Sequence, residues 1–238
     1  MMNTKELKPK ELFTNSSLAS YKLPALSFSI LIFIGQSAML IVFGKFTLID
    51  RIKNVDERIL NSIVDLFQSN SIIISIAETA TDLGKTQYNY YMAATIAAYI
   101  LIKFKNILPA IIVFLSMYFL VMYQKVTSNL VDGSIPTEDV IGIAGPFFSG
   151  GVARVVLLTG LICITVFKIK PNNAYKIAIL LGLFEGLTRL ALARHWPLDI
   201  IGGLFAGLAI LLLTSKLLEP WLSSKPKHNQ TGSEPKSN

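Results

Sequence analysis

The chain consists of long apolar blocks that alternate with short polar segments. A helix needs roughly 20 mostly apolar residues to cross the hydrocarbon core of a bilayer, and six blocks approach or exceed that length. They cover residues 24–46, 87–104, 107–129, 152–167, 174–193 and 197–218. The pattern predicts an all-α, polytopic membrane protein in which residues 24–218 form one bundle of six transmembrane helices.

The connection between the first two blocks, residues 47–86, carries a different pattern. Val55, Ile59, Ile63 and Phe67 recur at helical spacing among charged residues. This spacing predicts an amphipathic helix near residues 52–70 that lies on the extracytoplasmic membrane surface. An ordinary helix packed against the bundle explains the same spacing equally well.

Composition and charge agree with a membrane protein. Hydrophobic residues make up 52% of the chain and charged residues 16%, whereas soluble domains carry about 25% charged residues. The net charge of +7 comes from lysines in the tails and short loops, which argues against a nucleic-acid partner. The positive-inside rule then places both tails, residues 1–23 and 219–238, in the cytoplasm. The second tail is polar and predicted to be disordered.

The candidate chemistry lies at the break between the last two blocks. The chain has two histidines, and one of them, His228, belongs to the polar C-terminal tail. The other, His195, follows Arg189 and precedes Asp199 at fixed spacing. Ionisable groups beside lipid are costly and mark functional sites. An arginine that binds an anion, a histidine that attacks it and a carboxylate that orients the histidine indicate phosphoryl chemistry. A structural polar cluster joining two helices is the alternative.

A second polar cluster precedes the fourth block on the same side of the membrane. Ser149, Gly150 and Gly151 stand where free backbone N–H groups at a helix start bind anions, although a simple helix cap explains them equally well. Lys125, near the end of the third block, lies on this side too, and its alternative role is snorkelling to the interface.

These segments resemble the type 2 phosphatidic acid phosphatase (PAP2) superfamily, whose motifs are K-x6-R-P, P-S-G-H and S-R-x5-H-x3-D. The third motif is similar to Thr188-Arg189-x5-His195-x3-Asp199, and the second to Phe148-Ser149-Gly150-Gly151. The first is matched by Lys125, with Asp132-Gly133 in place of Arg-Pro. The resemblance runs in family order from the amphipathic segment to the sixth block.

The resemblance implies a role for each matched residue. His195 is the nucleophile that takes the phosphoryl group, and Asp199 orients its imidazole. Arg189, Lys125, Ser149 and Gly150 bind phosphate oxygens. The implied reaction needs neither a metal nor another cofactor. The implied partner is a membrane lipid with a phosphate or diphosphate group, met on the extracytoplasmic face of a plasma membrane.

Two departures from the motifs shape the predicted substrate. Gly151 replaces the histidine that protonates the leaving oxygen in the family, and Asp132 replaces a phosphate-binding arginine. General acid catalysis contributes roughly a hundred- to ten-thousand-fold, and its loss matters least when the leaving group is already stable. We therefore expect a polyprenyl or other lipid diphosphate in preference to phosphatidic acid.

Two further charged residues lie near the candidate site. Glu185 lies four residues before Arg189, which favours an internal ion pair, whereas Arg154 could face phosphate or pair with a carboxylate.

The alternative function is a catalytically impaired relative that binds lipid phosphate headgroups or a membrane partner. A transporter is the weakest hypothesis, because the charges gather at one face rather than at the membrane midplane.

Overall fold

The computed structural model describes residues 48–130 and 147–223. Every regular element in these two ranges is helical. They are α2 (Leu48–Gln68), α3 (Ser71–Thr81), the 3-10 helix η2 (Asp82–Gly84), α4 (Thr86–Phe104), α5 (Ile107–Leu130), α6 (Gly150–Thr165), α7 (Pro171–Ala191) and α8 (Pro197–Leu222). The first predicted span, residues 24–46, and most of the two tails lie outside the described residues.

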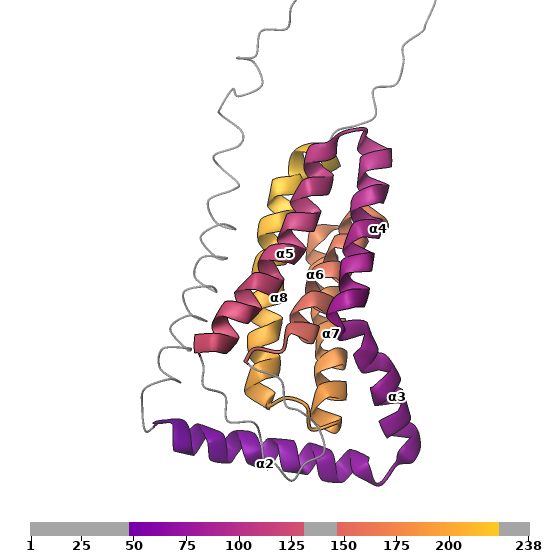
Figure 1. Ribbon diagram of the computed structural model, residues 1–238. Helices are drawn as coiled ribbons and strands as arrows, with labels where there is room; N and C mark the ends of the chain where they lie inside the picture. Colours follow the sequence, from indigo (N-terminus) through magenta and orange to yellow (C-terminus); the bar gives the residue numbers. More distant parts are fainter. Residues whose placement is uncertain (1–47, 131–146, 224–238) are drawn as a thin grey trace, which may run out of the picture.

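Helices α4 to α8 correspond to the second to sixth predicted spans and form one bundle (Figure 1). Among the described helices, α5 and α8 are each long and apolar enough to cross a membrane. Helix α7 carries Lys176, Glu185 and Arg189 within its apolar run, so it depends on its neighbours to cover charge. Helix α8 continues to Leu222, beyond the predicted end at residue 218.

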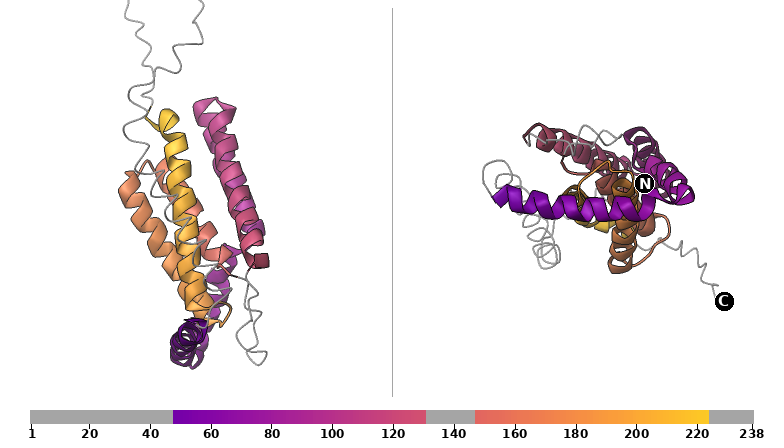
Figure 2. Two further views of the ribbon diagram at one scale, coloured as in Figure 1. Left: turned by 90° about the vertical axis from the view of Figure 1, so that its left-hand side faces the viewer. Right: turned by 90° about the horizontal axis from the view of Figure 1, so that it is seen from below.

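Helix α2 lies across one end of the bundle, where Figure 1 and the end-on view of Figure 2 both place it. Helix α2 includes most of residues 52–70, the segment whose spacing predicted an amphipathic helix. The chain then turns by 116° into α3. This helix was not predicted from the sequence, and its residues were included in the connection between the first two predicted spans. Asn70 causes this new start, because its side chain accepts hydrogen bonds from the N–H groups of Ile72 and Ile73.

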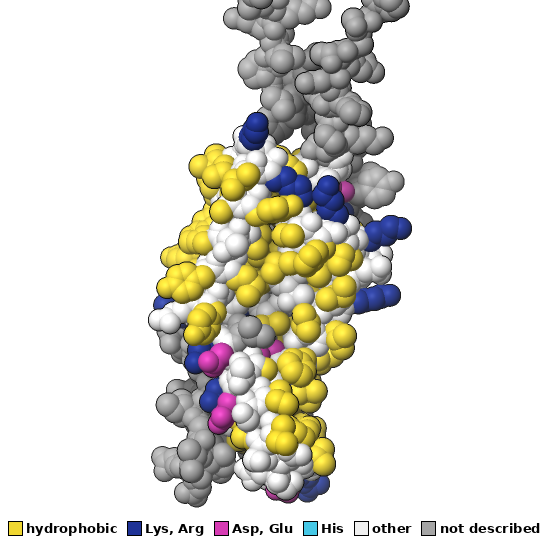
Figure 3. All heavy atoms as spheres, turned by 90° about the vertical axis from the view of Figure 1, so that its right-hand side faces the viewer, with side chains coloured by type: hydrophobic (Ala, Val, Ile, Leu, Met, Phe, Trp, Pro, Cys, Tyr) yellow, Lys and Arg dark blue, Asp and Glu magenta, His cyan; other side chains and the backbone are white. Residues whose placement is uncertain are grey.

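The surface has an apolar belt and a basic end. Figure 3 shows apolar side chains over much of one face, many of the Lys and Arg side chains toward the end distant from α2, and Asp and Glu side chains with a few basic ones nearer to α2. Large apolar side chains along α5 and α7, such as Phe119 and Leu180, are exposed, as lipid-facing residues are. This pattern agrees with an integral membrane protein.

Helix α6 is the central helix and is buried along most of its length. Helix α8 approaches it closely through two glycines. A Cβ atom at Gly203 or Gly207 would lie 2.5 Å from the backbone oxygen of Ser149 or Ala153. Only glycine permits this approach between the two helix backbones. The contact places the start of α6 beside the start of α8, where the candidate site lies.

Candidate active site

The turn between α7 and α8 holds His195 and Asp199 together. Pro197 begins α8, and Asp199 lies in its first turn. His195 Nδ1 and Asp199 Oδ2 are 3.2 Å apart, and the Trp196 N–H donates to the same oxygen at 3.1 Å. The histidine is 6% exposed and the aspartate 5%. With Nδ1–H donating to the carboxylate, Nε2 carries the lone pair that a nucleophile needs.

The second predicted cluster lies directly against this pair. The Ser149 N–H donates to the Asp199 backbone oxygen at 2.9 Å, and Ser149 is the N-cap of α6. The Ser149 hydroxyl is buried and makes no hydrogen bond to the described part of the chain. A buried hydroxyl without a partner is costly, so it is a donor available to an anion. The structure therefore brings together Ser149, Gly150, His195 and Asp199.

Arg189 reaches the same region from the last turn of α7 and is held by two acceptors. Its Nε donates to Glu185 Oε1 at 2.8 Å, and its Nη2 donates to the Thr81 backbone oxygen at 2.9 Å. The ion pair expected between Glu185 and Arg189 is thus present, and Glu185 is only 2% exposed. Nη1 makes no hydrogen bond within the described residues.

The space beside Gly151 is filled by this ion pair. A Cβ atom at Gly151 would lie 2.7 Å from Arg189 Nη2 and 3.1 Å from Glu185 Oε1. Gly84, in η2, approaches the pair from another side, where a Cβ atom would collide with Glu185 Oε1. The glycine at the position of the family's second-motif histidine therefore has a packing reason: any side chain there must displace the ion pair.

Arg154, one turn into α6, extends this polar network and is 6% exposed. Its Nη1 donates to Gln124 Oε1 and its Nη2 to the Gly84 backbone oxygen, both at 2.8 Å. It forms no ion pair with any described carboxylate, and its buried Nε lacks a partner there. Arg154 was predicted either to face phosphate or to pair with a carboxylate, and the pairing is not seen among the described residues.

Lys125 is the predicted phosphate ligand that the structure places least clearly in the site. Lys125 is exposed near the end of α5, and its ammonium group makes no ion pair with any residue that the structure describes. The preceding residue, Gln124, instead points inward to Arg154 and to the Phe148 backbone oxygen. The altered part of the first motif, Asp132-Gly133, lies outside the described residues.

Asp56 lies beside the candidate site and was not predicted from the sequence. Its Oδ1 accepts a hydrogen bond from the Leu198 N–H at 3.1 Å, which ties α2 to the first turn of α8. Burial and, to a smaller extent, the charge of Asp199 raise the pKa of Asp56 from 3.8 to about 6, although the hydrogen bond from Leu198 lowers it. No motif marks this residue, because its contact joins positions 142 apart in the chain.

This raised pKa predicts a pH dependence of stability. The folded chain binds the Asp56 proton more tightly than the unfolded chain does, so stability falls as pH rises from about 4 to about 6 and stays lower above. Asp56→Asn keeps an oxygen acceptor but carries no charge. We expect it to gain on the order of 2–3 kcal/mol over the wild type between pH 4 and pH 8.

Thermal unfolding of the detergent-solubilised protein at pH 4, 6 and 8 measures this effect. Asp65→Asn, at an exposed position on the same helix, is the matched control. A difference between Asp56→Asn and the wild type that does not change with pH would contradict the assignment.

Residues 132–222 match the family model described as PAP2 superfamily, which spans the second and third motifs and helices α6 to α8. Over this region the chain is similar to the PAP2 superfamily. The predicted resemblance to this superfamily is confirmed.

A solved structure has a similar fold over most of the chain. It is the transmembrane PAP2-type phosphatidylglycerolphosphate phosphatase from Bacillus subtilis, with a TM-score of 0.68 and 16% sequence identity. The match covers 81% of this chain and 96% of that one. At this identity the likeness shows a shared fold, so the predicted PAP2-type membrane bundle is confirmed. No curated protein matches the sequence.

Proposed function

We propose that the chain is a membrane lipid phosphatase or phosphotransferase that acts through a phosphohistidine at His195. The observation that carries the proposal is the buried His195–Asp199 pair, 3.2 Å apart, beside the N-terminus of α6. The oriented imidazole supplies a nucleophile, and the helix start supplies N–H groups and a positive dipole end for the phosphate. The PAP2 region and the phosphatase with the same fold support this reading.

The proposed reaction has two steps. His195 Nε2 attacks the phosphorus, a nitrogen–phosphorus bond forms, and the bond to the leaving oxygen breaks. Water, or a second acceptor, then attacks the phosphohistidine, which releases the phosphoryl group and restores the imidazole. Asp199 holds Nδ1–H throughout and stabilises the charge on the ring. Arg189, Lys125, Ser149 and Gly150 bind the phosphate oxygens, whose charge grows in the transition state.

The preferred substrate in this proposal is a lipid diphosphate. Gly151 offers no proton to the leaving oxygen, and the space beside it is taken by Arg189 and Glu185. Attack on the terminal phosphorus of a diphosphate expels a lipid monophosphate, which leaves readily without protonation. Attack on phosphatidic acid expels an alkoxide, which does not.

Phosphate release by the purified protein tests this preference. We expect a polyprenyl diphosphate to be hydrolysed at least about a hundredfold faster than phosphatidic acid, because the rate lost without a general acid is roughly a hundred- to ten-thousand-fold. The same assay on His195→Ala sets the background. Faster release from phosphatidic acid would contradict the proposed role of Gly151.

The runner-up proposal is a non-catalytic relative that binds lipid phosphate headgroups or a membrane partner. Gly151 favours it, because this position supplies no proton donor for a leaving oxygen and the space beside it is filled by Arg189 and Glu185. This alternative requires no release from either lipid and retained binding of a lipid phosphate that Arg189→Ala weakens. In both proposals the site faces the extracytoplasmic side of a plasma membrane and both termini are cytoplasmic.

A further inference from the structure

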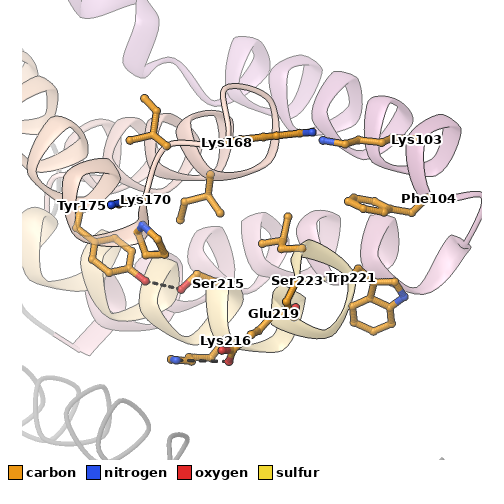
Figure 4. A pocket seen from close by; sticks show the side chains of 14 residues that line it. Lys103, Phe104, Lys168, Lys170, Tyr175, Ser215, Lys216, Glu219, Trp221 and Ser223 are labelled. Atoms are coloured by element: carbon orange, nitrogen blue, oxygen red, sulfur yellow. Dashed lines mark hydrogen bonds and ion pairs between the residues drawn. The ribbon is translucent and has the colours of Figure 1, made fainter. Parts of the chain in front are cut away.

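A cavity of about 830 Å³ opens at the end of the bundle opposite His195. The end of α4, the turn between α6 and α7, and the last turns of α8 surround it (Figure 4). His195 lies where α7 ends and α8 begins, so the lengths of both helices separate the cavity from the candidate active site. None of the motif residues lines it.

The cavity is basic. Four lysines line it, Lys103, Lys168, Lys170 and Lys216, against the single carboxylate of Glu219. That carboxylate is already paired with Lys216 at 3.4 Å. Lys168 and Lys170 make no ion pair with any residue that the structure describes. The lining therefore holds a surplus of three positive charges, four minus one.

Two of the lysines face one another over the cavity. Figure 4 shows the side chains of Lys103 and Lys168 reaching toward each other from α4 and from the turn after α6. Lys103 is fixed there, because its Nζ donates to the Thr165 backbone oxygen at 2.8 Å and lies over the Tyr99 and Phe104 rings. Two ammonium groups so placed repel each other, and both attract an anion that lies between them.

The remaining walls suit a phospholipid rather than a bare ion. Tyr175 and Ser215 contribute a pair of hydroxyl groups 2.7 Å apart, which can bond to glycerol or phosphate oxygens. Helix α7 begins beside them at Pro171, and its first turn carries no acidic residue against its positive dipole end. Phe104 and Trp221 add aromatic surface for the apolar part of a lipid.

The chain's own tails do not complement this charge. Residues 1–23 contain four lysines and two glutamates, and residues 224–238 contain three lysines and one glutamate, so each tail carries +2. The cytoplasmic leaflet, by contrast, is rich in anionic lipids, and basic pockets between transmembrane helices bind their headgroups. We propose that this cavity binds the phosphodiester headgroup of an anionic phospholipid of the cytoplasmic leaflet. This inference rests on the proposed orientation in the membrane but not on the proposed phosphatase activity.

Binding of short-chain phosphatidylglycerol to the full-length protein in neutral detergent tests the proposal, with phosphatidylcholine as the uncharged comparison. The variant Lys168→Gln/Lys170→Gln removes two charges from the cavity. The matched control, Lys105→Gln/Lys176→Gln, removes two charges from exposed positions at the same end that do not line it. We expect the cavity variant to bind phosphatidylglycerol roughly 10- to 30-fold more weakly and the control to change less than about twofold. Thermal unfolding confirms that both variants are folded.

Three outcomes would overturn the proposal. Equal losses in the two double variants would show a general effect of charge rather than a site. Full competition by inorganic phosphate at low millimolar concentration would identify a free anion as the ligand. Binding that appears only after residues 224–238 are removed would show that the chain's own C-terminal segment is the occupant.

Discussion

His195→Ala is expected to lower phosphate release from a lipid diphosphate by at least about a thousandfold. The nucleophile itself is removed, and within the described residues no other histidine can form the covalent intermediate. Asp199→Asn is expected to cost about a hundred- to ten-thousand-fold. Its amide carries no negative charge, so it holds His195 less firmly in the Nδ1–H tautomer and stabilises positive charge on the imidazole less than the carboxylate does.

Rapid quenching with a substrate labelled in its terminal phosphate measures both effects and the intermediate. The wild type should carry an acid-labile label on one histidine, and neither variant should accumulate it. His228→Ala, at the only other histidine of the chain, is the matched control and should behave as the wild type. Undiminished turnover by His195→Ala would overturn the enzymatic proposal. No turnover in the wild type, with lipid phosphate still bound, would favour the binding protein instead.

The helices of the bundle could be predicted because each depends on its own sequence. An apolar block with polar ends specifies a buried or lipid-facing helix wherever it packs, so α4 to α8 begin and end within a few residues of the predicted spans. The spacing of His195 and Asp199 is equally local, since Pro197 starts the helix on which the aspartate lies. The first span, at residues 24–46, stays a prediction.

Contacts between distant segments could not be predicted in this way. Asp56 meets Leu198 only because α2 lies across the end of the bundle. Gln124 looks like one polar residue in an apolar block, and its role becomes visible only when α6 brings Arg154 to it. The start of α3 depends on one asparagine, whose capping hydrogen bonds interrupt what the sequence presents as a single connection.

The buried ion pair between Glu185 and Arg189 is expected to be the costliest polar contact to break. Glu185→Leu would leave Arg189 without its carboxylate, next to the partly unpaired Arg154, in a region where Glu185 is only 2% exposed. Removing one partner of a buried pair typically costs about 3–5 kcal/mol, because the other charge stays buried and uncompensated. For a chain of this size the loss corresponds to a fall of about 10 °C in Tm.

Thermal unfolding in detergent measures this effect, and the chain offers a matched control. Glu219 pairs with Lys216 at 3.4 Å on an exposed part of α8, so Glu219→Leu should change stability by less than about 1 kcal/mol. Glu185→Gln, which keeps an oxygen acceptor for Arg189 Nε, should fall between the two. If Glu185→Leu proved as mild as Glu219→Leu, the pair could not be what holds α7 against Thr81 and Gly84. In that case the ion pair would not explain the glycine at position 151.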